Sequence, residues 1–68
     1  MQISARNQLK GTVTSVTVGN VMAEVGVDVG GQEIVAAITR ASAESLDLAE
    51  GDDVTVIIKA TEVMVAKE

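Results

Sequence analysis

The chain has 68 residues, a formal net charge of −5 and 47% hydrophobic residues, but no His, Cys, Phe, Tyr or Trp. The length suits one globular domain, residues 1–68, and a disordered tail would be far less apolar. The usual zinc ligands and the Ser–His and Cys–His catalytic pairs are excluded. The missing aromatic rings and the acidic charge argue against binding to nucleic acid or to an anionic membrane. We therefore expect a non-enzymatic, cytoplasmic protein.

The first half of the chain predicts three β-strands after an extended segment, residues 1–9, which we expect to be available for strand exchange between subunits. Gly19-Asn20 separates the strands at 12–18 and 21–29 as a tight two-residue turn, which glycine suits because it tolerates the positive φ of a left-handed turn, and Gly30-Gly31 separates the second strand from 33–39. Apolar and polar residues alternate along 21–29, which indicates a half-buried strand. Val13 and Val16 are out of phase, which predicts a bulge near Thr14-Ser15.

The second half predicts a short helix and two further strands. Ser42 precedes a helix-forming run and is a plausible N-cap, Gly51-Asp52 forms a turn, and residues 54–59 and 60–66 form strands four and five. Three strands, a helix and two strands are the element order of an oligonucleotide/oligosaccharide-binding (OB) barrel. We predict an all-β, five-stranded OB-like barrel with one short helix between strands three and four. An SH3-like barrel is the alternative.

The small core predicts an oligomer. A domain of this length buries only about 60% of its unfolded surface. No aromatic side chain, disulfide or zinc site is available to add stability. Residues 34–38 are apolar on both faces, so one face can enter the core while a neighbouring subunit covers the other.

The few basic residues stand beside hydroxyl groups that would suit a tetrahedral oxyanion. Arginine offers a planar fork of donors, lysine a compact charge, and serine and threonine neutral donors. The alternative is that these are ordinary solvated surface residues and a helix cap. The acidic residues lack the spacing of a calcium loop, so we expect no metal bound directly by side chains. The candidate set is Ser4, Arg6, Thr39, Ser42 and Lys59.

Three segments resemble the molbindins, small proteins that bind molybdate and tungstate: Ile-Ser-Ala-Arg-Asn-Gln-Leu at 3–9, Ala-Ala-Ile-Thr-Arg-Ala-Ser at 36–42, and 54–64. The resemblance implies an OB-type hexamer, a trimer of dimers, that stores molybdate or tungstate between subunits and has no catalytic cofactor. A molybdate-sensing interaction module is the alternative function. In the implied main site, one subunit supplies Ser4, Arg6, Lys59 and Ala60, and its neighbour supplies Thr39 and Ser42. A second oxyanion site is assigned to the turn at Gly19, Asn20 and Val21.

Overall fold

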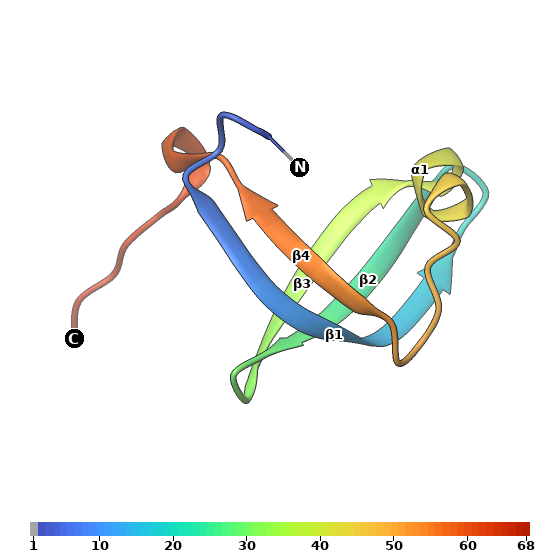
Figure 1. The fold of residues 1–68 in the computed structure, drawn as a ribbon, viewed down its shortest axis with the longest axis horizontal. Helices are drawn as coiled ribbons and strands as arrows, with labels where there is room; N and C mark the ends of the chain where they lie inside the picture. Colours follow the sequence, from blue (N-terminus) through green and yellow to red (C-terminus); the bar gives the residue numbers. More distant parts are fainter. Residues whose placement is uncertain (1) are drawn as a thin grey trace.

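Four antiparallel strands form one strongly bent sheet in a computed structural model, which describes residues 2–68 (Figure 1). The sheet order is β3-β2-β1-β4, and its two edges do not meet. The only α-helix among the described residues follows β3, and a single 3-10 turn follows β4. The elements are β1 (Asn7–Val18), β2 (Met22–Val29), β3 (Gln32–Thr39), α1 (Arg40–Ser45), β4 (Asp53–Ile58) and η1 (Ala60–Glu62).

The core lies on the inner face of the bend, where valines from β1 and β2 meet. Val13, Val25 and Val27 are 1–3% exposed, and half-buried side chains from β3 and β4 pack against them. The register of β1 against β2 shifts between Val13 and Ser15. This bulge leaves Thr14 as the extra residue and so returns Val16 to the inner face, where it packs against the core. The predicted bulge is confirmed.

The two hairpin turns reverse the chain with different backbone conformations. Gly30 and Gly31 have φ angles of 58° and 85° and join paired residues of β2 and β3, as a two-residue turn with two left-handed positions requires. The β1–β2 connection instead spans residues 19–21, and Gly19 N–H donates to the Met22 carbonyl at 2.7 Å. Gly19 and Asn20 do not have positive φ. The expected left-handed Gly-Asn turn is therefore wrong.

The start of β1 also differs from the expectation. Residues 7–9 belong to β1 and pair with β4 of the same chain, with Asn7 opposite Ile58 and Leu9 opposite Val56. The prediction that residues 1–9 lie outside the strands is therefore wrong for residues 7–9. The pairing arises because the alternation of inner-face side chains begins at Leu9, before the predicted strand start at residue 12, and Leu9 lies opposite Val56.

The end of the chain contains no fifth strand in the described residues. Residues 60–62 form the 3-10 turn, and residues 63–68 have no regular secondary structure. The sequence pattern of 60–66 is that of a strand, but a strand forms only against a partner edge, and the turn after β4 directs this segment away from the sheet (Figure 1). A closed five-stranded barrel within one chain is therefore not what the structure contains.

Candidate functional site

The start of α1 presents two hydroxyl groups in a fixed arrangement. Thr39 is the N-cap, and its side-chain oxygen accepts a hydrogen bond from the Ser42 backbone N–H at 3.1 Å. The same oxygen lies 2.8 Å from Ser42 Oγ. Ser42 was predicted as the cap, but it lies inside the helix, because Thr39 at the end of β3 already satisfies its free amide. Both predicted residues are nevertheless brought together, with both side chains exposed.

The turn assigned to a second site lies against the same end of the helix. Arg40 N–H donates to the Val21 carbonyl at 2.7 Å, which ties the turn at 19–21 to the first residue of α1. All three turn residues are exposed. The Arg40 side chain turns along the helix, where Nε lies 2.6 Å from Glu44 Oε1. This pair is the only salt bridge within residues 2–68, so the one cation at this end is already neutralised.

The other predicted residues flank the paired ends of β1 and β4. Ser4 and Arg6 come just before Asn7, and Lys59 and Ala60 come just after Ile58. Asn7 and Ile58 face each other across the ladder, and Asn7 Nδ2 donates to the Ile58 carbonyl at 3.1 Å. The side chain of Gln8 donates to the Ala5 carbonyl at 2.9 Å and braces the approach to β1. Arg6 and Lys59 therefore adjoin paired residues at this strand end, and neither forms an ion pair within the described chain.

These two groups of residues lie at opposite ends of β1. Asn7 begins this 12-residue strand, whereas Val18 ends it opposite Ala23, and Ala23 in turn pairs with Ile38, the neighbour of Thr39. Figure 1 shows the start of β1 and η1 at one side of the molecule and α1 at the other. The strand holds the two groups apart. One chain therefore contains both halves of the predicted main site but does not bring them together.

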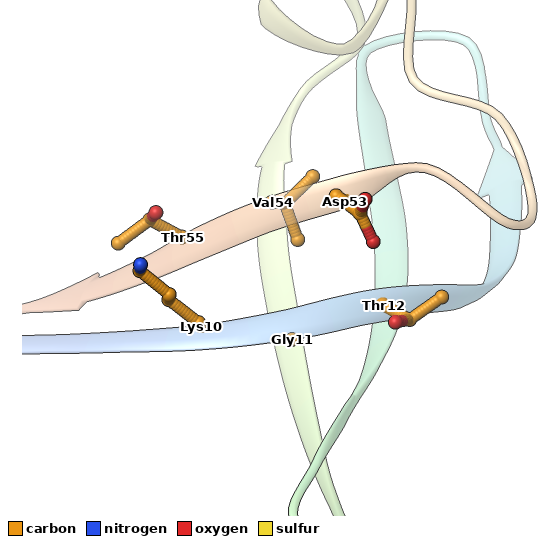
Figure 2. A pocket seen from close by; sticks show the side chains of 6 residues that line it. All are labelled: Lys10, Gly11, Thr12, Asp53, Val54 and Thr55. Carbon is orange, nitrogen blue, oxygen red and sulfur yellow. The ribbon is translucent and has the colours of Figure 1, made fainter.

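A separate groove of about 580 Å³ lies over β1 and β4 (Figure 2) and was not predicted. Lys10 faces Thr55 across the ladder, and Thr12 faces Asp53. The carboxylate of Asp53 disfavours an anion here, so this groove does not fit the chemistry of the predicted site. Polar residues alternate at 10–12 and at 53–55 in the sequence, which indicates one exposed face on each strand. Only the pairing of the two strands places these residues together.

Gly11 lies beneath this groove because β2 passes very close to it. A Cβ atom built at Gly11 would lie 2.6 Å from the Asp28 carbonyl oxygen and 2.7 Å from a Val27 methyl carbon. Such contacts are too short for a side chain. The glycine therefore allows β1 to lie this close to β2 next to the first pair of their ladder, Thr12 and Asp28.

The described residues provide no direct metal centre. Within residues 2–68 there is no group of three or more acidic side chains that could hold a metal ion. No helix in this part of the chain is both long and apolar enough to cross a membrane.

The chain is similar to known proteins over almost its full length. The family model described as "TOBE domain" matches residues 3–65. Molybdenum-pterin-binding protein 3 from Clostridium pasteurianum is 47% identical over 66 residues, covering 96% of this chain and 97% of that protein. A molybdate-binding protein from Sporomusa ovata, known as a solved structure, is 51% identical with a TM-score of 0.95, covering 98% of this chain and all of the other.

A third similar protein is the cytoplasmic molybdate-binding protein ModG, whose structure was solved with molybdate bound. It is 48% identical with a TM-score of 0.84, and the match covers 88% of this chain and 43% of ModG. The fold is thus the OB-like fold of these neighbours, with an open four-stranded sheet in the single chain. The matched model and the full-length relatives establish that the chain belongs to the TOBE-domain family, among its small molybdenum-pterin-binding (Mop) proteins.

Proposed function

We propose that this protein binds molybdate or tungstate between subunits of a homo-oligomer and serves as a cytoplasmic store of the anion. The observation that carries this proposal is the division of the predicted residues between the two ends of β1. It is supported by the molybdate-binding proteins of similar sequence and fold.

The chemistry of the two ends is complementary. Arg6 and Lys59 supply the positive charge that a dianion needs, and the adjoining Ser4 and Ala60 supply a hydroxyl and a backbone amide. Thr39 and Ser42 of a second chain supply oriented hydroxyl groups. Burial of a dianion is costly unless its oxygens are hydrogen-bonded, so neither end alone suffices. A site completed only on assembly excludes water and strengthens each hydrogen bond.

The expected assembly is a hexamer built as a trimer of dimers. Only five apolar residues of the described chain are buried: Val13, Ala23, Val25, Val27 and Ala43. Val35 on the outer face of β3 is 58% exposed, although it lies in an apolar run. A chain with so small a core gains stability from subunit contacts. Sedimentation equilibrium at micromolar concentration tests this, and a stable 7.0 kDa monomer would contradict the proposal.

Binding is tested by calorimetric titration with molybdate, tungstate and sulfate, followed by thermal unfolding with each anion. A ligand at about 100 times its dissociation constant stabilises the folded protein by roughly 2.7 kcal/mol. We expect clear stabilisation by molybdate or tungstate and less by sulfate, whose shorter bonds to oxygen would stretch the contacts. Equal effects of all three anions would indicate a generic salt effect, and no effect would refute the function.

The shared nature of the site is tested by mixing two defective variants. Arg6→Ala removes a charge from one end and Thr39→Val removes a hydroxyl from the other, and each variant alone should bind molybdate more weakly than the natural protein, Arg6→Ala the more so. When the two are unfolded and refolded together, some interfaces combine an intact Arg6 with an intact Thr39. High-affinity binding should return at those interfaces. If each site were formed within one chain, mixing would restore nothing.

A further inference from the structure

Hydrogen bonds hold the backbone of Lys59 on both sides, although this residue lies beyond the end of β4. On one side, the Asn7 side chain donates to the carbonyl of Ile58, the residue before Lys59, at 3.1 Å. On the other side, the Lys59 carbonyl accepts from Glu62 N–H at 2.9 Å in η1. Each carbonyl shares a rigid plane with the amide that follows it. The two bonds therefore fix both peptide planes that flank the Lys59 Cα, and with them the direction in which its side chain leaves the backbone.

Arg6 is held in a similar way at the start of β1. The Gln8 side chain donates to the carbonyl of Ala5, the residue before Arg6, at 2.9 Å. On the other side, Asn7 is the first residue of β1 and is already paired with β4. Arg6 therefore stands between a hydrogen-bonded peptide and the start of the sheet, which restricts its backbone on both sides.

These two amides differ in place from the other side-chain hydrogen bonds of residues 2–68. The others all lie within residues 39–52, in α1 and the connection that follows it. Asn7 and Gln8 are neighbours on a strand, so their side chains leave opposite faces of the sheet. Each reaches the peptide that precedes a basic residue. Two consecutive amides therefore hold the two chain segments that carry the positive charges of this strand end.

We propose that Asn7 and Gln8 are positioning residues of the oxyanion site, with Asn7 acting through Lys59 and Gln8 through Arg6. This inference rests on the proposed function. Neither amide touches the anion or orients the cationic group itself; each fixes the backbone from which that group extends. A ligand that meets a prearranged backbone loses less affinity to the ordering of the protein. Loss of either bond should therefore weaken molybdate binding although both charges remain.

Two variants remove the amides and keep the charges: Asn7→Leu and Gln8→Met. Each should lower the affinity for molybdate by about 3- to 10-fold, the contribution of one hydrogen bond, and sedimentation equilibrium should show the assembly of the natural protein. Gln32→Met makes the same exchange at an exposed glutamine at the start of β3 and should leave the affinity unchanged. Unchanged affinity in both amide variants would overturn the proposal. If Asn7→Leu does not assemble, Gln8→Met decides, because Gln8 is exposed.

The pairing of each amide with one basic residue separates positioning from a merely structural role. Gln8→Met should lower the affinity of a Lys59→Ala protein but change that of an Arg6→Ala protein little, because the side chain that it positions is then missing. Asn7→Leu should show the reverse. Calorimetric titration of the double variants with molybdate measures these couplings. A general defect of the strand end would lower the affinity alike in both backgrounds, and that result would overturn the proposal.

The same titrations distinguish a failure of this proposal from a failure of the function on which it rests. If the natural protein bound no molybdate, both would be wrong. If the affinity fell with Arg6→Ala but with neither Asn7→Leu nor Gln8→Met, only the positioning role would be wrong.

Discussion

The two ends of β1 differ in what they would supply to the proposed anion site. The end beside Asn7 and Ile58 has two positive charges, Arg6 and Lys59, that form no ion pair within residues 2–68, and a single side-chain hydrogen bond joins the neighbouring strands there. The end at Thr39 has hydroxyl groups held by local hydrogen bonds, and its one cation is neutralised by Glu44. The end beside Asn7 and Ile58 therefore has charge but no oriented donors, and the end at Thr39 has oriented donors but no free charge.

The contrast bears on when the proposed site would form. Arg6 and Lys59 stand at the same end of β1 and are exposed, so water and salt screen their mutual repulsion in the single chain. In the proposed assembly, the bound dianion would balance these two charges, and the hydroxyl groups of a second chain would supply neutral donors.

The largest expected effect is at the charged end. Arg6→Ala removes one charged hydrogen-bonding partner from a desolvated site, which typically costs about 2–5 kcal/mol of binding, or roughly 30-fold or more in affinity. Arg6 is exposed in the single chain, so stability without ligand should change by less than about 0.5 kcal/mol. Titration with molybdate measures the affinity. Lys10→Ala, which removes an exposed charge outside the site, is the control and should bind as the natural protein does.

Gly11→Val tests the part of β1 that separates the ends. Its side chain would collide with the Asp28 carbonyl and with the valines of β2, so we expect a loss of about 1–3 kcal/mol or more in unfolding free energy. Urea denaturation measures this. Gly19→Ala places a Cβ 3.1 Å from its nearest neighbour, the Met22 carbonyl oxygen, and should cost less. Equal losses would mean that the close approach of β1 and β2 is not what requires Gly11.

Thr39→Val tests what the Thr39 hydroxyl contributes to stability and to molybdate binding. The substitution keeps the shape but removes the cap of α1, which should lower stability by about 1 kcal/mol. Loss of a neutral hydrogen bond, about 0.5–1.5 kcal/mol, should weaken molybdate binding less than Arg6→Ala does. Urea denaturation and titration measure the two effects. Thr39→Ser keeps the hydroxyl and should restore both; a Thr39→Val protein with unchanged affinity would remove this end from the site.

The smallest effect is expected from Arg40→Ala. The Arg40 and Glu44 side chains are 50% and 62% exposed, and an exposed i,i+4 pair contributes about 0.3–0.5 kcal/mol. Stability should fall by no more than that, and molybdate affinity should stay unchanged because Arg40 lies outside the site. A large loss of affinity would show that the hydroxyl end also supplies a cation, and the contrast between the two ends would then fail.

Local patterns were most informative where neighbouring residues decide the conformation. The Gly30-Gly31 turn and the bulge near Thr14 were predictable, since left-handed φ angles and alternating valines are local properties. The cap at Ser42 was misassigned because both Thr39 and Ser42 are suitable caps, and the choice depends on where β3 ends. The left-handed turn at Gly19 was wrong because a three-residue connection reverses the chain without it.

By itself, the sequence determined the residue types available for chemistry and the alternation that makes four strands: a cysteine-free, histidine-free chain has Arg and Lys as its cations, and hydroxyl groups, Asn and Gln amides and backbone amides as its neutral donors, to hold an anion. The tertiary structure alone decided where these groups lie. Strand pairing acts over long sequence distances, so only the register of β1 against β4 and β2 reveals that Arg6 and Thr39 lie at opposite ends. The strand-like pattern of 60–66 shows the same limit, because a strand needs a partner edge, and the turn at η1 leads this segment away from its own.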